Sequence, residues 1–201
     1  MEIAQFLNTF CRLPQRDLWV FGYGSLMRSP GFRASEQATA LVRGYHRARC
    51  ILSSRYRGTP EKPGLVMGLC RGGSCWGIAL RIPRVRVRRV LTKLWKREML
   101  NKVYKPTLIP VTVAPGRRGG RVKQLRALAF VADPTHRQFV GELDLHGRAR
   151  LAAQGIGQRG SCVDYIRNTL EHMLALGVGD PHLSRVLDLA LSHSPAGKHK
   201  K

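Results

Sequence analysis

The chain has 201 residues, of which 43% are hydrophobic and 7% aromatic, so we expect one domain with a mainly aliphatic core. No apolar run reaches the roughly 18 residues of a membrane helix, and no secretory pattern opens the sequence, which predicts a cytoplasmic protein without membrane contact. The net charge is +23, from 35 Lys and Arg against 12 Asp and Glu. This charge favours anionic ligands, but its even spread along the chain disfavours nucleic acid as the partner.

Apolar periodicity and turn residues predict a mixture of strands and helices. The expected elements are a helix over 1–16, a strand over 18–21, one or two strands over 41–56, strands over 65–70 and 76–82 around a turn at 71–74, a helix over 84–100, strands over 108–114 and 124–132 around a hairpin turn at 117–120, and helices over 148–153, 163–176 and 182–192.

The order of these elements predicts the fold class. Strands gather before residue 133 and most helices follow, which indicates an α+β fold with a mainly antiparallel sheet or small barrel. We expect a helical extension over 1–16, one domain over 17–192 and a disordered basic tail over 193–201. The sequence does not indicate an oligomeric state.

Five cysteines offer no pattern of a structural site. Their number is odd and their spacing irregular, and the pair Cys70 and Cys75, five apart, fits no common zinc motif. We therefore expect reduced thiols and no metal site.

Glu98 is the most unusual residue of the chain. It is the one carboxylate between residues 62 and 132, a stretch that holds 17 Lys and Arg. It also lies four residues after Leu94 and seven after Leu91, so it continues the apolar face of the predicted helix. Such a half-buried carboxylate is a candidate general base. The alternative is a structural ion pair, with Arg97 or with an arginine of a facing strand.

Gly22-Tyr23-Gly24-Ser25 follows a predicted strand but lacks both common nucleotide-binding glycine patterns. Glycines there allow a ligand to approach the backbone, whose N–H groups could hold a carboxylate or a developing oxyanion. The alternative is a simple connection from a strand to a turn.

Several blocks together resemble the ChaC family of γ-glutamylcyclotransferases. The sequence WVFGYGSLM at 19–27 closely resembles the signature loop of that family. Further similar blocks follow in the family's order, at 44–47, 57–59 with 63–64, 76–81, 94–99 with 104–106, 129–134 and 164–166. The likeness covers roughly residues 17–190, and Glu98 stands where the family has its catalytic glutamate.

This resemblance implies a small mixed, mainly antiparallel barrel flanked by helices. It implies cyclisation of the γ-glutamyl group of glutathione, which gives 5-oxoproline and Cys-Gly without a cofactor. Glu98 would then be the general acid and base. The implied substrate contacts are the backbone of Tyr23, Gly24, Ser25 and Leu26, the hydroxyl of Tyr165, and Arg57, which could hold a substrate carboxylate. For Tyr165 and Arg57, packing and turn support are the alternatives.

Two positions depart from the family pattern. Arg28 stands where the family often has Trp, and Cys162 stands where many members have Asn. Specificity among γ-glutamyl compounds is therefore open, and other γ-glutamyl amines or dipeptides are an alternative substrate class. A basic nucleic-acid-binding protein on the same fold is a further alternative.

Overall fold

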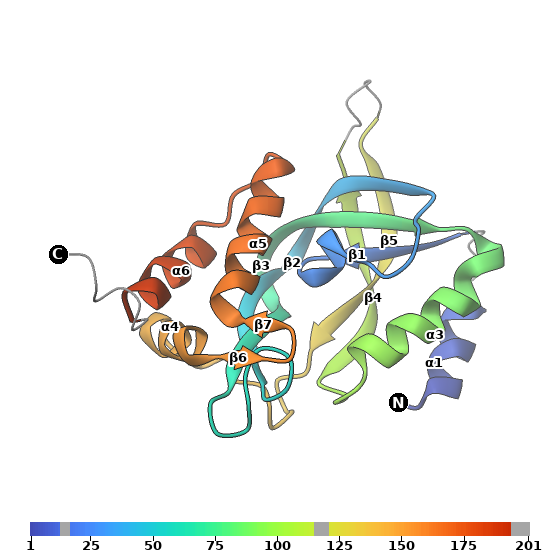
Figure 1. Cartoon of the computed structure of the whole chain (residues 1–201). Coiled ribbons are helices and arrows are strands. Elements are labelled where there is room, and N and C mark those ends of the chain that lie inside the picture. The colour runs from blue at the N-terminus through green and yellow to red at the C-terminus, as the bar shows by residue number, and fades with distance from the viewer. Residues whose placement is uncertain (13–16, 115–120, 194–201) are drawn as a thin grey trace. The chain divides into compact units, whose positions relative to one another are not determined.

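The computed structural model describes residues 1–12, 17–114 and 121–193 (Figure 1). Its elements, in chain order, are α1 (Ile3–Cys11), β1 (Leu18–Gly22), α2 (Ser25–Arg28), β2 (Glu36–Ser53), β3 (Gly64–Ile82), the 3₁₀ turn η1 (Arg84–Arg86), α3 (Val87–Glu98), β4 (Tyr104–Val113), β5 (Lys123–Ala132), α4 (Leu145–Gln154), β6 (Ile156–Gly157), β7 (Gly160–Ser161), α5 (Cys162–Ala175) and α6 (Pro181–His193). The expected hairpin turn at 117–120, the tail from 194 onward and the end of the first predicted helix at 13–16 lie outside these residues.

Five strands form a closed barrel, which the family resemblance implied and the element order left open beside a sheet. Their order is β1-β3-β2-β4-β5, with a further pairing of β3 with β5. β1 runs antiparallel to β3, with Val20 opposite Leu80, and parallel to β5, with Trp19 opposite Ala127. The barrel is therefore mixed, and closure leaves few free strand edges for other chains to pair with.

Contacts between parts of the chain divide the protein into two compact units. Unit 1 comprises Met1–Arg47 and Leu69–Val131, and unit 2 comprises Ala48–Gly68 and Ala132–Lys201. Unit 1 holds all of β1 and β4, the larger part of each of β2, β3 and β5, and the helices α1 to α3. Unit 2 holds the helices α4 to α6 and the small antiparallel ribbon of β6 and β7.

The core of unit 1 lies in and around the barrel. All residues of β1 except Trp19 and the whole second half of β5 are buried, and α3 adds a stripe of Val87, Val90, Leu91 and Leu94. The ring of Phe6 in α1 lies 5.1 Å from that of Trp95 in α3 and 6.5 Å from that of Phe130 in β5. The aromatic residues of α1 thus tie this helix to α3 and to the barrel.

The structure corrects one prediction about β3. The sequence predicts two strands around a reversing turn at 71–74, but these residues continue a single strand of 19 residues. Gly72 and Gly73 have positive φ angles of 91° and 69°, as in a bulge, and the Gly72 carbonyl lies 3.0 Å from His46 Nδ1 of the neighbouring strand. Two glycines therefore bend the strand and do not reverse it.

The remaining predicted elements are found with shifted bounds. β2 is one strand that begins five residues before its predicted start, and the first turn of the helix predicted over 84–100 is the 3₁₀ turn η1. The ribbon of β6 and β7 was not expected, because its strands have two residues each. Among the described residues, no helix is both long enough and apolar enough to cross a membrane.

Candidate active site

Glu98 is the last residue of α3, and its side chain is only 15% exposed. The buried stripe of α3 ends with Leu94, one turn before Glu98, so the predicted position on the inner side of the helix is confirmed. A carboxylate at the carboxyl end of a helix meets the negative end of the helix dipole, which disfavours its charge. A nearby cation offsets this effect.

That cation is Arg97. Its Nε lies 2.9 Å from Glu98 Oε1, so the ion pair considered as the structural alternative is present. The same guanidinium donates through Nη2 to the Ser25 hydroxyl at 2.8 Å and through Nη1 to the Ser29 carbonyl at 2.5 Å. Arg97 therefore joins the Glu98 carboxylate to the loop after β1. The sequence suggested Arg97 only as an ion-pair partner of Glu98, and its contacts with that loop give it a second role.

The loop after β1 makes a tight turn into the short helix α2. Tyr23 is buried, and its hydroxyl donates to the Phe130 carbonyl at 2.5 Å. Met27 N–H donates to the Gly24 carbonyl at 2.9 Å and so closes the first turn of α2. The N–H groups at the start of a helix have no acceptor within it. Those of Ser25 and Leu26 are consequently suited to bind an oxygen atom of a ligand.

Arg47 braces this loop from β2. Its Nε donates to the Tyr23 carbonyl at 2.5 Å, and its Nη2 donates to the Trp76 carbonyl in β3 at 2.5 Å. The sequence marked 44–47 as one of the similar blocks but gave Arg47 no role. The alternation of residues along a strand does not reveal that the half-buried Arg47 guanidinium donates to two backbone carbonyls.

Tyr165 and Arg57, the other predicted substrate contacts, lie together in unit 2. Tyr165 is a buried residue of α5, and the guanidinium carbon of Arg57 lies 4.9 Å from the centre of its ring. Arg57 Nη1 also donates to the Ser161 carbonyl at 3.1 Å. Partial burial lowers the pKa of Arg57 from its usual value, because desolvation disfavours the charged form, and the nearby Tyr165 opposes this shift.

Close backbone packing holds Arg57 in place. A Cβ on Gly64 would collide with the Arg57 carbonyl, and one on Gly157 would lie 2.5 Å from the Tyr56 carbonyl carbon. A Cβ on Gly58 would collide with the Gly64 nitrogen, so no side chain fits at these three glycines. The loop at 57–64 therefore packs directly on the segment around β6.

A second arginine lies on the same tyrosine. Arg49 is only 2% exposed, donates to the Leu65 carbonyl and to Cys162 Sγ, and lies with its guanidinium carbon 5.7 Å from the Tyr165 ring centre. Cys162 also accepts from Leu65 N–H at 3.2 Å. The departure at Cys162 thus belongs to a buried polar contact with Arg49, which the sequence did not predict.

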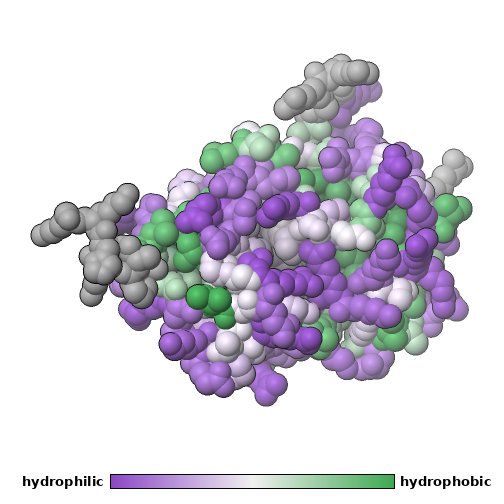
Figure 2. Space-filling model, viewed as in Figure 1, coloured by the Kyte–Doolittle hydropathy of each residue, from purple (hydrophilic) through white to green (hydrophobic). Residues whose placement is uncertain are grey.

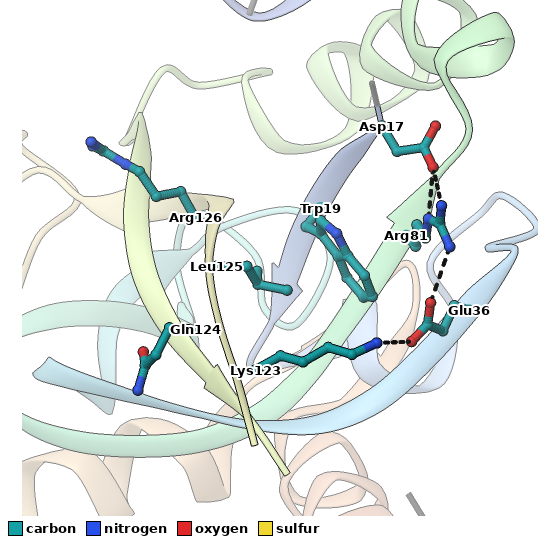
Figure 3. Close-up of a pocket in the computed structure, with 8 residues that line it drawn as sticks. All are labelled: Asp17, Trp19, Glu36, Arg81, Lys123, Gln124, Leu125 and Arg126. Carbon is teal, nitrogen blue, oxygen red and sulfur yellow. Dashed lines mark hydrogen bonds and ion pairs between the residues drawn. The ribbon is translucent and has the colours of Figure 1, made fainter. Parts of the chain in front are cut away.

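A separate pocket of about 550 Å³ lies on unit 1 (Figure 3). Arg81 lies between two carboxylates there, 2.6 Å from Asp17 Oδ2 and 3.3 Å from Glu36 Oε2. Lys123 reaches Glu36 at 3.9 Å, and the Trp19 ring lies between these charges and Leu125. Asp17 also accepts from the Arg84 N–H, just before the start of α3. Glu98 is at the other end of α3, about 18 Å along the helix axis, so this pocket is separate from Glu98. Apart from Arg126, which donates to the Leu108 carbonyl, the ionic groups of this pocket are paired with one another.

Comparison with solved structures defines the class of fold. The crystal structure of a yeast γ-glutamyl cyclotransferase specific to glutathione matches with a TM-score of 0.82 at 20% identity, and the match covers 92% of this chain and 100% of that one. The barrel with its flanking helices is therefore the fold of a γ-glutamylcyclotransferase.

Comparison of sequences then gives the family. The sequence model of the ChaC-like protein family matches residues 18–192, and the chain belongs to this family. A glutathione-specific γ-glutamylcyclotransferase of Escherichia coli K12 is 33% identical over 88% of this chain and 74% of its own length. Glutathione-specific γ-glutamylcyclotransferase 1 of Homo sapiens is 30% identical over 85% of this chain and 77% of its own length.

Proposed function

We propose that this protein degrades glutathione by cyclising its γ-glutamyl group, which releases 5-oxoproline and Cys-Gly. The observation that carries the proposal is the half-buried Glu98, joined through Arg97 to the loop after β1. The names of the related bacterial and human enzymes support the reaction and its substrate.

Glu98 moves the proton in this mechanism. The α-amine of the γ-glutamyl group is mostly protonated near neutral pH, and the ammonium form cannot attack a carbonyl. The Glu98 carboxylate takes a proton from this amine, whose nitrogen then bonds to the γ-carbonyl carbon. When the C–N bond to the cysteine residue breaks, Glu98 returns the proton to the leaving nitrogen, and the ring nitrogen releases its second proton to solvent to give the neutral lactam.

The loop after β1 stabilises the charge that develops on the substrate. The γ-carbonyl oxygen becomes an oxyanion in the tetrahedral intermediate. Backbone N–H groups over Tyr23, Gly24, Ser25 and Leu26 are the proposed donors, since fixed dipoles stabilise such a charge most effectively. The bracing of Tyr23 by Arg47 and Phe130 supports this role, because the donors have to be held in position before the reaction.

Tyr165 and Arg57 are the proposed contacts with the polar groups of the substrate. Arg57 and Arg49 both lie against the Tyr165 ring, and no ion pair joins either arginine to a carboxylate of the described residues. Two such guanidinium groups favour a negatively charged ligand. A substrate carboxylate held by Arg57, with a hydroxyl contact from Tyr165, is consistent with this charge.

The cytoplasm is the proposed location. None of the five cysteines, Cys11, Cys50, Cys70, Cys75 and Cys162, forms a disulfide. Reduced thiols are typical of proteins in that compartment, where glutathione itself is abundant.

The test is product analysis with the purified protein. Incubation with glutathione should release 5-oxoproline and Cys-Gly in equal amounts, as measured by chromatography with mass detection. The same incubation with γ-glutamyl-alanine should give much slower release of 5-oxoproline. Faster turnover of γ-glutamyl-alanine than of glutathione would show that the substrates are other γ-glutamyl amines or dipeptides. Absence of 5-oxoproline from both compounds would contradict the proposed cyclisation.

A further inference from the structure

The solvent side of α3 gathers four cations on one face. Arg88, Arg89, Lys93 and Lys96 are all exposed, and Figure 2 shows hydrophilic residues over the region where α3 lies in Figure 1. At 100° per residue these four side chains fall within an arc of about 140°, centred opposite the buried stripe of the helix. We call them the α3 basic face.

No carboxylate neutralises this face. Among the described residues, none of its four side chains has an ion pair. The acidic groups of unit 1 pair elsewhere, Asp17 and Glu36 with Arg81, Glu2 with Lys102, and Glu98 with Arg97. Like charges three and four residues apart, as at Arg89, Lys93 and Lys96, destabilise a helix by about 0.2–0.5 kcal/mol per pair. The protein thus bears a small free-energy cost to keep the face positive.

We propose that the α3 basic face binds the phosphate backbone of nucleic acid without reading the base sequence. Its cations extend over about 12 Å of helix, from Arg88 to Lys96, a length that can contact several successive phosphates. This inference does not depend on the proposed enzymatic function, because none of these residues belongs to the candidate active site.

The burial of the helix favours nucleic acid over a membrane surface. A helix that binds an anionic membrane inserts its apolar face between the lipid headgroups. In α3 the apolar residues Val90, Leu91 and Leu94 are buried in the protein core. From Arg88 to Lys96 the exposed side carries no apolar residue, so its attraction is purely electrostatic.

The sequence alone did not favour this partner, because the cations are spread evenly along the chain. Folding changes that distribution locally. A repeat of three and four residues in α3 directs Val87, Val90, Leu91 and Leu94 inward, and the cations between them collect on the opposite side.

The test is the binding of a fluorescein-labelled DNA duplex of random sequence, measured by fluorescence anisotropy over a range of salt concentrations. The face variant carries Arg88→Gln, Arg89→Gln, Lys93→Gln and Lys96→Gln, since glutamine keeps a good helix propensity. The slope of log K against log salt is negative, and each lost phosphate contact should reduce its magnitude by about 0.9. We therefore expect the magnitude of the slope to fall by about 3–4 and the binding to weaken by roughly tenfold or more at low salt.

A matched variant controls for net charge. In it, glutamine replaces four exposed arginines on other parts of the chain. None of them has an ion pair among the described residues; they are Arg43, Arg71, Arg137 and Arg150. It loses the same charge and should bind the duplex within about threefold of the wild type. If the face variant misfolds by circular dichroism, the double variant Arg88→Gln with Arg89→Gln replaces it, with an expected slope change of about 2.

Three results would overturn the proposal. Equal losses in the face variant and the matched variant would show a general attraction by net charge. The wild type would fail the test outright if it did not bind the duplex at about 50 mM salt. Binding to phosphatidylserine vesicles without binding to the duplex would assign the face to a membrane surface.

Discussion

Arg97 controls the position of the Glu98 carboxylate. It contacts Glu98, the Ser25 hydroxyl and the Ser29 carbonyl at once, so the change Arg97→Gln removes three interactions from one point. We expect kcat to fall by up to about 100-fold, since small displacements of a catalytic group have effects of that size. Steady-state kinetics with glutathione measures the change, and KM should move by less than about threefold because Arg97 acts through Glu98.

The conservative variant distinguishes geometry from charge. Arg97→Lys keeps the charge beside Glu98 but cannot make the three directed contacts, so it should recover only part of kcat. Full activity in Arg97→Gln would show that the Glu98 carboxylate is held without this guanidinium.

Asp17 makes the stability of unit 1 depend on pH. The Arg84 N–H, followed by the Arg81 side chain, lowers the pKa of this carboxyl from its usual value. A group with a lowered native pKa stabilises the fold above its unfolded pKa of about 3.9 and loses this contribution as pH falls through the native pKa. Asp17→Asn should therefore destabilise the protein near neutral pH and have a smaller effect at about pH 3, below the unfolded pKa.

Urea unfolding at the two pH values measures this difference. Asp188→Asn is the control, because Asp188 is exposed and has no ion pair among the described residues. An equal pH dependence in the Asp17 variant and the wild type would contradict the account.

At the scale of elements, the loop at 57–64 depends on the absence of a side chain at Gly64. A methyl group there collides with the Arg57 carbonyl, so Gly64→Ala should lower the free energy of unfolding by about 2 kcal/mol or more. Gly179→Ala is the matched control, because nothing lies within 4 Å of its Cβ position, and it should change stability by less than about 0.5 kcal/mol. Denaturant unfolding measures both, and equal stabilities would show that the loop relaxes freely.

The comparison of sequence with structure is clearest in α3 and β3. Periodicity predicted α3 and the half-buried position of Glu98, because local spacing decides which side of a helix faces the core. It was wrong for β3, where Gly72 and Gly73 look like a turn. Whether glycines bend or reverse a strand depends on the neighbouring strand, here β2 at His46, and this pairing is not a local property.

The site shows the same limit. The resemblance of residues 19–27 and 94–99 to family motifs located Glu98 and the loop after β1, and the structure joins them. The contacts of Arg97 with Ser25 and of Arg49 with Cys162 link residues 72 and 113 positions apart. Such contacts arise from tertiary packing, so a single sequence gives no signal for them.

At the scale of the whole molecule, the net charge of +23 opposes folding through self-repulsion. Screening shortens the range of this repulsion to about 10 Å at 0.1 M salt. We therefore expect Tm to rise by roughly 2–4 °C, equivalent to about 1 kcal/mol, between about 20 mM and about 300 mM NaCl. Differential scanning calorimetry measures this shift. A constant or falling Tm would show that the cations are neutralised within the fold.

The domain bounds predicted from the sequence, 17–192, stay a prediction. The family match covers residues 18–192, whereas chain contacts separate two units that each draw on two segments of this range. A family domain is a continuous stretch of sequence, whereas a compact unit is defined by contacts in the folded chain. The sequence therefore predicts the family domain but not the two compact units.

The most direct test of the account is the rate of 5-oxoproline release from glutathione by wild type and by Glu98→Gln, with the fold checked by circular dichroism. Glutamine keeps the size of the side chain but cannot accept the amine proton, so kcat should fall by about 10²–10⁴-fold with the fold unchanged. A Glu98→Gln variant that folds and keeps most of the wild-type rate would contradict the role of Glu98 as the general acid and base.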